Sequence, residues 1–425
     1  MTGGLVTAQL GISVRLTPTV PETARFAGSL ELGLRQNPKR AQLLVSRLLG
    51  KHIPVPVGDV LGAAHALGGL VRGACAGQTP VVIGFAETAT GLGHGVAAVS
   101  AADGGPAPCW HTTRRPAPPG AHVLRFDEEH SHATDQSLAV LDDAPLRCGR
   151  PLVLVDDELT TGKTAVNAIR ALHARWPRTL YVLASLVDCR SDQMGAAVAA
   201  AVRDLGAQVV TVSLLDGHVR LPAEVLPKAR AFIASLSATP AILNGARAQV
   251  SFADVILPEE LPALGLAGWS REQEMTARTA MCRAADTLPV ARDGRTLVLG
   301  DEELMYLPQL LAAALGAEVR TSTTTRTPAV VIDRLGYPLR TVLEFGSTDD
   351  GHRAAYAYNV APSRLPGPGN APGFDDIVLV TDAAPGPRTS DLVAKLAASA
   401  RRSVHVLTLH PSDVLAAAGE RDAAQ

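Results

Sequence analysis

Two adjacent carboxylates followed by a hydroxyl-rich loop form the most informative segment of the sequence. Residues 152–164 read LVLVDDELTTGKT, so an apolar strand ends at Asp156 and Asp157 before a loop leads into a helix. Open α/β sheets bind ligands at the carboxyl ends of their strands, and backbone N–H groups at a helix N-terminus attract anions. Paired carboxylates repel a bare phosphate but suit a sugar's vicinal hydroxyls or a hydrated Mg²⁺. The segment therefore predicts a site for a phosphorylated sugar.

The loop that follows the acids carries the groups that hold a phosphate. Its hydroxyls can donate hydrogen bonds to phosphate oxygens, and Gly162 permits a close backbone approach or a positive φ. The predicted phosphate-binding residues are Thr160, Thr161, Gly162, Lys163 and Thr164. The loop ends like a Walker A motif, but Asp157 stands where that motif requires its first glycine. The sequence therefore argues against a P-loop kinase or ATPase.

The stretch VLVDDELTTGKT, residues 153–164, resembles the signature of type I phosphoribosyltransferases. In that signature an apolar strand, two acids and a threonine-rich loop follow one another, and an incidental strand–loop–helix is the weaker alternative. The resemblance implies a Rossmann-like fold that uses phosphoribosyl pyrophosphate (PRPP) with Mg²⁺. It implies that Asp156 and Asp157 contact the ribose hydroxyls and that residues 160–164 hold the 5-phosphate. Purine-salvage members place an aspartate where Thr160 stands, so the chain looks more like the orotate branch.

Residues 81–95, VVIGFAETATGLGHG, have the strand-and-loop form of the pyrophosphate-binding element in such enzymes. We expect Thr88, Thr90 and Gly91 to contact the pyrophosphate, because hydroxyl and backbone N–H groups are donors to anions. Taken alone, this pattern fits a glycine-rich turn that binds no ligand equally well. Its position before the acid pair favours the binding role.

Two adjacent arginines follow a short predicted strand in the segment CWHTTRRP, residues 109–116. Arg114 and Arg115 suit the negative charge of a pyrophosphate, because a guanidinium binds such a group bidentately. Type I enzymes carry a basic catalytic loop in this region, so the resemblance implies a catalytic role for both. A solvated arginine pair on the surface is the alternative.

The segment EEHSH, residues 128–132, places two carboxylates and two imidazoles within five residues. The sequence offers no separate third ligand cluster, HExxH motif or cysteine partner, which argues against a zinc site. We expect a lid or a substrate contact here instead. His130 or His132 would protonate the leaving pyrophosphate or orient the substrate.

Residues 34–55, LRQNPKRAQLLVSRLLGKHIPV, combine basic side chains with a predicted amphipathic helix. This segment is a candidate hood over the acceptor, and a basic solvated helix face is an equal alternative. Taken with GFAETATGLGH, EEHSH and DDELTTGKT, it resembles the phosphoribosyltransferases encoded in tellurite-resistance (Ter) gene clusters, over about residues 30–220. The resemblance implies a nucleotide-like product linked to tellurite or stress resistance.

The phosphoribosyltransferases of Ter clusters carry a C-terminal TRSP domain, which is named after a short sequence motif. Residues 325–328 read TRTP here, and GDEELMYLP at residues 300–308 also resembles that domain. The hydroxyl-rich turn and the acids each follow a predicted strand, so both are candidates for a polar ligand site. Turn chemistry and helix N-capping explain them equally well. The candidate residues of the second half are Asp301, Glu302, Thr325 and Arg326.

Short apolar runs alternate with Ala-rich helical stretches over most of the chain, which predicts βαβ units with a buried parallel sheet. In the first half we expect strands at 81–85, 152–155, 180–187 and 209–214 and helices at 59–75, 164–175 and 193–205. In the second half we expect strands at 296–299, 319–322, 329–332, 341–345, 377–380 and 404–407 and helices at 271–285, 306–315 and 390–400. The predicted fold is a Rossmann-like parallel sheet of the type I phosphoribosyltransferase kind, followed by a second α/β domain.

The order of strands and helices lapses at residues 257–269, where two prolines and two glycines occur. We place a linker there. It separates a phosphoribosyltransferase-like domain at residues 1–256 from a TRSP-like domain at residues 270–425.

Composition narrows the classes of partner. The chain has 39 basic and 41 acidic residues, and aromatic residues make up only 4%. This balance argues against nucleic acid or an anionic membrane as partner. The five scattered cysteines contain no CxxC pair, so no disulfide framework is predicted. The sequence shows no signal peptide and no apolar run of spanning length, which predicts a cytoplasmic protein.

The sequence therefore predicts an enzyme that transfers ribose 5-phosphate from PRPP, with Mg²⁺ held mainly through substrate and near Asp156 and Asp157. The acceptor would be a small molecule, a nitrogen heterocycle, and Asp188 is a candidate contact for it. The resemblance also implies a homodimer and partner proteins from the Ter cluster. One alternative is a regulator that senses PRPP or a nucleotide without turnover. Another is a lyase or phosphorylase that degrades a ribosylated compound.

Overall fold

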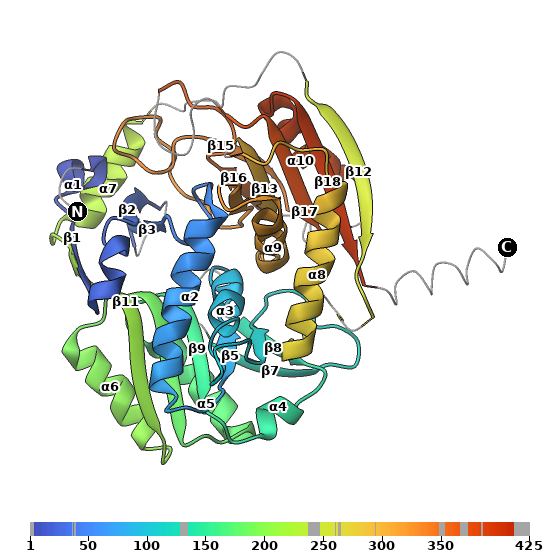
Figure 1. Ribbon diagram of the computed structural model, residues 1–425. Coiled ribbons are helices and arrows are strands. Elements are labelled where there is room, and N and C mark those ends of the chain that lie inside the picture. Colours follow the sequence, from blue (N-terminus) through green and yellow to red (C-terminus); the bar gives the residue numbers. More distant parts are fainter. Residues whose placement is uncertain are drawn as a thin grey trace.

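Two six-stranded sheets organise the described part of the chain, one in each half (Figure 1). The computed structural model describes residues 4–35, 37, 40–127, 135–236, 247–259, 261, 265–293, 295–347, 353–365, 373–383 and 386–411. No helix within these ranges is long and apolar enough to span a membrane.

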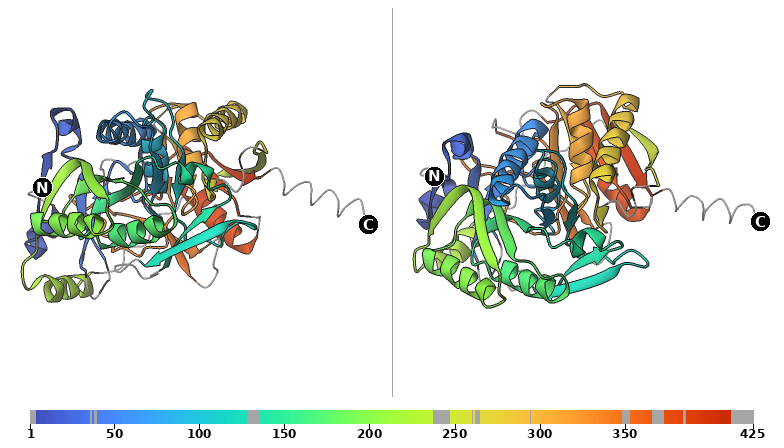
Figure 2. Two further views of the ribbon diagram at one scale, coloured as in Figure 1. Left: turned by 90° about the horizontal axis from the view of Figure 1, so that it is seen from below. Right: turned by 60° about the horizontal axis from the view of Figure 1, so that its bottom comes forward.

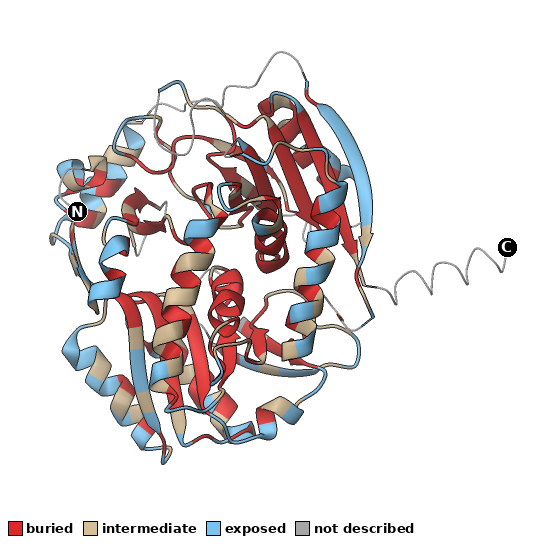
Figure 3. Ribbon diagram, viewed as in Figure 1, coloured by how far each residue is buried: buried red, intermediate tan, exposed pale blue. Residues whose placement is uncertain are grey.

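The sheet of the first half is parallel except at one edge. Its strand order is β1 (Ser13–Pro18), β11 (Gln208–Arg220), β10 (Leu180–Asp188), β9 (Leu152–Leu159), β5 (Val81–Gly84) and β6 (Cys109–His111). Of these strands, β1 alone is antiparallel to its neighbour. Its central strands are almost entirely buried (Figure 3), as expected for a parallel sheet covered on both faces.

Successive residues of these strands contact different helix layers. Val153 and Val155 pack in one core with α2 (Val57–Ala74) and α3 (Thr90–Ala97). Leu152 and Leu154 pack in another core with α5 (Lys163–Arg175) and α6 (Asp192–Arg203). The two helix layers lie on opposite sides of the sheet, as the views of Figure 2 show. This arrangement confirms the predicted Rossmann-like α/β architecture.

The sheet of the second half is also parallel except at one edge. Its order is β12 (Gln249–Ile256), β18 (Ser403–His410), β17 (Asp376–Thr381), β13 (Thr296–Gly300), β14 (Arg320–Thr323) and β4 (Val55–Pro56), with β4 antiparallel to β14. Helices α8 (Arg271–Thr287) and α9 (Tyr306–Leu315) share a core with one face. Helix α10 (Pro387–Ser399) and the hairpin of β15 (Val342–Gly346) and β16 (Ala354–Tyr358) share a core with the other.

The remaining described elements lie outside the two six-stranded sheets. They are α1 (Leu5–Leu10), η1 (Pro21–Phe26), β2 (Leu30–Leu34), β3 (Gln42–Ser46), β7 (His122–Asp127), β8 (Asp135–Val140), α4 (Ala144–Arg147) and α7 (Val225–Ala234).

Two segments differ from their predicted secondary structure. The prediction of an amphipathic helix within residues 34–55 is wrong, because β2 and β3 pair there as an antiparallel hairpin. Leu43 and Val45 of this hairpin are buried, and a short apolar run of this kind does not distinguish strand from helix by periodicity. The strand expected at residues 329–332 is also absent. That stretch lies beside β2 and forms a hydrogen bond with it, because the Val330 N–H donates to the Leu34 carbonyl at 2.9 Å.

The chain enters the second sheet earlier than the expected linker at residues 257–269. Strand β12 pairs with β18 along its whole length, from Gln249 opposite Ser403 onward. Within the expected linker, Trp269 is buried and its backbone exchanges hydrogen bonds of 2.9 and 2.7 Å with Cys109 of β6. Strand β4 lies on the far edge of the second sheet although it comes from the first half. The two halves therefore interlock instead of meeting only at a linker.

Candidate functional site

The acid pair lies on β9, which continues through it to Leu159. Asp156, Asp157 and Glu158 are all half-buried, and the N–H of Asp157 donates to Asp156 Oδ1 at 2.9 Å. Burial, together with the nearby negative charge of Glu158, raises the pKa of Asp157. Glu158 itself forms an ion pair with Arg40, whose Nη2 lies 2.6 Å from Glu158 Oε1. The strand therefore presents three successive carboxylates, one of which is already paired.

The hydroxyl-rich loop turns from β9 into α5 through Gly162. Gly162 has a φ of +80°, and a Cβ there would lie 2.6 Å from Cγ2 of Val198. A larger residue would therefore be strained and would also clash. Thr160 and Thr164 line a pocket together with Asp156 and Asp157. Among the other predicted loop residues, Lys163 is exposed at the first position of α5, and its N–H donates to the Thr161 hydroxyl at 3.4 Å.

The loop after β5 reaches the same pocket through Ala86, Glu87 and Thr88. Lys51 contacts this loop: its Nζ donates to the Thr88 hydroxyl at 2.8 Å and lies 3.7 Å from Glu87 Oε1. Burial opposes ionisation of Glu87, but the positive charges of Lys51, Arg326 and Arg114 outweigh it and lower the pKa of Glu87. The loop therefore carries a buried carboxylate held ionised by surrounding cations.

Two predicted residues of that loop lie outside the pocket lining. Thr90 is buried at the start of α3, and its hydroxyl donates to the Glu303 carbonyl at 3.0 Å. A Cβ at Gly91 would lie 2.7 Å from Nε2 of Gln309 in the second half. The structure thus places both at the contact between α3 and the second half. Of the predicted contacts, Thr88 alone lines the pocket.

The adjacent arginines have different surroundings. Arg114 lines the pocket, and its N–H donates to Glu303 Oε1 at 2.9 Å. Arg115 is not part of the pocket lining, and its guanidinium instead forms a bidentate ion pair with Asp382, at 2.6 and 3.1 Å. His130 and His132 lie outside the described residues.

The second half forms one wall of the pocket. Arg326, Thr327 and Pro328 of the TRTP segment line it, together with Arg353 and Tyr356 of the β15–β16 hairpin region. Hydrogen bonds of 2.9 and 2.8 Å join the backbones of Thr325 and Tyr356, so the segment and the hairpin are held together.

The acids predicted for the second half do not line the pocket but contact residues in or beside its lining. Asp301 accepts from the hydroxyls of Thr324 and Thr381 at 3.0 and 2.9 Å. Glu302 Oε2 lies 3.0 Å from Nε of Arg326. Asp301 and Glu302 are both buried and do not line the pocket. Among the predicted residues of the second half, Arg326 is the one in the lining.

The pocket has a volume of about 610 Å³ and is lined mostly by charged and polar residues. Its charged lining residues are Arg35, Arg40, Lys51, Arg114, Arg326 and Arg353 on the basic side and Glu87, Asp156, Asp157 and Glu158 on the acidic side. The cations outnumber the acids, which suits a ligand of high negative charge.

Sequence reasoning did not single out several of these residues. Lys51 was visible only as one of several basic side chains, and Glu87 only as part of a glycine-rich loop. Glu158 directly follows the predicted acid pair, so its place on the same strand was the clearest available signal. Arg353 and Tyr356 had no signal of their own, because only the packing of the second half brings them to the pocket.

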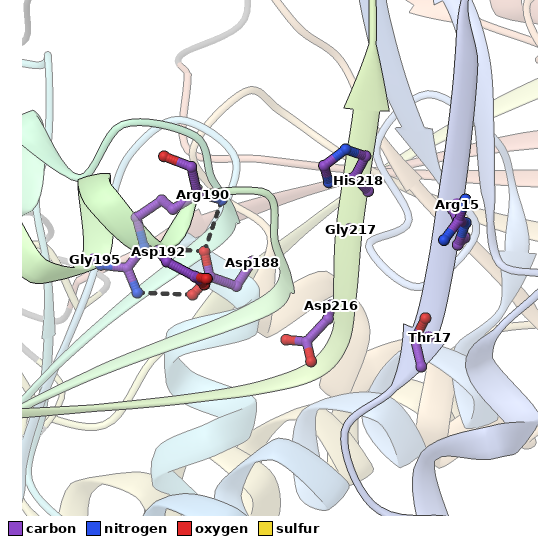
Figure 4. A pocket seen from close by; sticks show the side chains of 10 residues that line it. Arg15, Thr17, Asp188, Arg190, Asp192, Gly195, Asp216, Gly217 and His218 are labelled. Carbon is purple, nitrogen blue, oxygen red and sulfur yellow. Dashed lines mark hydrogen bonds and ion pairs between the residues drawn. The ribbon is translucent and has the colours of Figure 1, made fainter.

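Asp188, the candidate acceptor contact, lies in a different pocket of about 500 Å³ beside the ends of β10 and β11. Asp188 forms a bidentate ion pair with Arg190, at 2.9 and 2.7 Å (Figure 4). Burial and the charge of Asp188 raise the pKa of Asp216, which lines the same pocket. Asp188 therefore lines a different pocket from the acid pair, although its strand β10 is the neighbour of β9.

The parallel sheet, the acid pair on β9 and the threonine-rich start of α5 have the arrangement that the sequence predicted. Residues 30–218 match the family model of a phosphoribosyl transferase, and residues 264–396 match that of the TRSP domain found C-terminal to this transferase. The two matches follow one another along the chain and together support a phosphoribosyltransferase domain followed by a TRSP domain.

Solved structures of other phosphoribosyltransferases are similar to parts of the chain. The adenine phosphoribosyltransferase of Trypanosoma brucei is 14% identical over 48% of this chain and 82% of its own, with a TM-score of 0.33. The adenine phosphoribosyltransferase of Rhodothermus marinus is 16% identical over 44% and 96%, with a TM-score of 0.31. The orotate phosphoribosyltransferase of Aeropyrum pernix is 18% identical over 48% and 94%, with a TM-score of 0.28. No curated protein matches the chain.

Proposed function

We propose that the chain transfers ribose 5-phosphate from PRPP to a nitrogen heterocycle and releases pyrophosphate. The observation that carries this proposal is a single pocket that combines the acid pair, the start of α5 and a set of cations. The N-terminus of α5, with Thr160 and Thr164, suits the 5-phosphate. Asp156 and Asp157 suit the ribose hydroxyls as hydrogen-bond acceptors.

Other residues of the same pocket suit the pyrophosphate of the donor. Lys51 and Arg114 supply positive charge there, and Thr88 supplies a hydroxyl. During transfer, negative charge builds up on the leaving pyrophosphate while positive character develops at C1 of the ribose. Cations placed beforehand around the pyrophosphate and carboxylates placed beside the ribose stabilise both changes in charge.

The residues of the pocket fit Mg²⁺ as a cofactor bound mainly through the donor. The described residues contain no cluster of three His, Cys, Asp or Glu that would form a ready-made metal site. Asp156 and Asp157 nevertheless offer carboxylate oxygens, which Mg²⁺ prefers as ligands when substrate phosphates complete its shell. When bound, Mg²⁺ would neutralise charge on the pyrophosphate.

The acceptor is proposed to be a planar heterocycle. Tyr356 is the aromatic residue among the described residues that line the pocket, and its ring is half-buried there. A ring of this kind can stack on a flat acceptor. We further propose, from the resemblance to enzymes of tellurite-resistance clusters, that the product is a nucleotide-like metabolite linked to tellurite or stress resistance.

Calorimetric titration with PRPP and Mg²⁺ tests the proposal. We expect Mg²⁺-dependent binding by the wild-type chain and its loss in the double variant Asp156→Asn/Asp157→Asn, because the variant removes both charges beside the ribose. Asp204→Asn is the matched control, since Asp204 is exposed at the end of α6. A screen of purine, pyrimidine and pyridine bases for pyrophosphate release should then identify the acceptor.

The outcomes separate the proposal from its rival. No binding of PRPP by the folded wild type would contradict the transferase proposal. PRPP binding without pyrophosphate release for every base tested would favour the alternative, a regulator that senses PRPP or a nucleotide.

A further inference from the structure

Arg326 of the TRTP segment reaches the pocket from the second half. The segment follows β14, and the Thr324 N–H donates to the carbonyl of Gly300 at 3.0 Å, which fixes the start of the turn. The Arg326 side chain is only 13% exposed, and it lines the same pocket as Glu87 and Thr88. A guanidinium from the second half therefore lies within the site built by the first half.

Two buried carboxylates fix the position of this guanidinium. Glu302 Oε2 lies 3.0 Å from Arg326 Nε, and Glu303 Oε1 lies 3.2 Å from Arg326 Nη2. Glu302 is held in turn, because its N–H donates to the Thr324 hydroxyl at 2.9 Å and Ser347 Oγ donates to its carboxylate at 2.7 Å. The guanidinium is therefore placed in advance of any ligand, which reduces the entropy lost on binding.

Glu303 also fixes a cation of the first half. It accepts from the Thr113 hydroxyl at 2.5 Å and from the Arg114 N–H at 2.9 Å. One buried carboxylate therefore holds Arg326 and the backbone that carries Arg114. The charges of both arginines act on Glu87, so the two guanidinium groups converge on the loop that Lys51 also covers.

We propose that Arg326 binds the pyrophosphate group of the donor and that Glu302 and Glu303 are its positioning residues. This inference rests on the proposed function, because it takes the Glu87–Thr88 loop as the pyrophosphate side of the PRPP site. The second half of the chain is then part of the transferase site, and the arginine of the TRSP-type motif is its contribution.

Separate titrations with inorganic pyrophosphate and with ribose 5-phosphate, both with Mg²⁺, test this inference on the full chain. Arg326→Ala should weaken pyrophosphate binding roughly ten- to a hundredfold, the effect of losing a charge-assisted hydrogen bond. Ribose 5-phosphate binding should be unchanged. Arg271→Ala is the matched control, because Arg271 also joins the two halves, through an exposed pair with Asp103 at 2.7 Å, and should change neither affinity.

Two further variants keep the test decisive. Arg326→Ala leaves two buried carboxylates without their cation and could unfold the chain. Arg326→Lys keeps the charge but not the planar fork, so we expect an intact melting temperature and an intermediate loss of pyrophosphate affinity. Thr160→Ala should show the reverse selectivity, with weaker ribose 5-phosphate binding and unchanged pyrophosphate binding.

The positioning role has its own readout. Glu302→Ala should weaken pyrophosphate binding, and Glu302→Gln, which keeps an acceptor for Arg326, should restore part of it. Wild-type pyrophosphate affinity in folded Arg326→Ala and Arg326→Lys would overturn the inference and leave the proposed function standing. If the wild type bound neither pyrophosphate nor PRPP, the proposed function itself would fail.

Discussion

Asp157 differs from an ordinary surface aspartate because it shares β9 with two other carboxylates. Burial and the charge of Glu158 raise the pKa of Asp157, so it takes up a proton at a higher pH than usual. The ionised form is the one that can act as a Mg²⁺ ligand. We therefore expect PRPP binding to weaken as the pH falls through this raised pKa.

Replacing Glu158 tests this dependence. Glu158→Gln removes a like charge, which lowers the pKa of Asp157 and should move the weakening of PRPP binding to lower pH. The measurement is the dissociation constant of PRPP between about pH 4 and 8, with Asp204→Asn as the control variant. Superimposable pH profiles for wild type and Glu158→Gln would show that Asp157 does not control binding.

At the level of elements, a buried carboxyl lies between α8 and α9. Glu274 of α8 accepts a hydrogen bond of 2.6 Å from the Tyr306 hydroxyl and one of 2.8 Å from Arg278. Burial raises the pKa of Glu274 to about 7, although Arg278 and the Tyr306 hydrogen bond act in the opposite direction. The group is therefore protonated in the folded chain at a pH where the unfolded chain has already lost the proton.

This shift predicts a pH-dependent stability with a definite sign. Between the ordinary pKa of about 4.3 and the folded pKa of about 7, the folded state binds more protons than the unfolded state. The free energy of unfolding should therefore decrease as the pH rises through this window. Thermal melting at pH 5, 6, 7 and 8 measures the effect, and Glu274→Gln should flatten the curve. An equally steep decline in the variant would assign the dependence to another group.

At the scale of the whole molecule, the two halves are joined by backbone pairing and by side chains. Strand β4 extends the second sheet, Trp269 pairs with Cys109 of the first sheet, and the hydroxyl of Ser322 donates to the Lys51 carbonyl at 3.0 Å. Lys51 is a pocket residue, so the second half positions part of the site in the first. These contacts give a physical reason for a single cooperative unfolding transition.

The ion pair of Arg115 with Asp382 is expected to contribute to this coupling. Its side chains are 8% and 17% exposed, and a partly buried bidentate pair should couple more strongly than an exposed one. A double-mutant cycle with Arg115→Ala and Asp382→Ala should give a coupling energy above about 1 kcal/mol. The exposed pair of Arg271 and Asp103 is the matched comparison, and its coupling energy should be smaller because solvent screens the two charges. Equal coupling energies for the two pairs would contradict the expectation.

Much of the fold was predictable because local patterns and tertiary packing agree. The helix expected at residues 306–315 is observed with those bounds, and the apolar runs at β9 and β10 form buried parallel strands. The β2–β3 hairpin was not predictable, because its short apolar runs acquire strand geometry only by pairing with each other and packing into the core. The same reasoning explains why β12 could not be assigned to the second sheet, since its partner β18 lies about 150 residues further along the chain.

The sequence by itself determined the acid pair, the threonine loop and the parallel α/β architecture, because these depend on residues that are adjacent in the chain. Only the tertiary structure decided which cations reach the acids. Arg114 and Arg115 are neighbours in sequence, yet one lines the pocket and the other pairs with Asp382. Arg326 comes to the same pocket from the second half because the packing of two sheets, and not the spacing of residues along the chain, sets the distance between them.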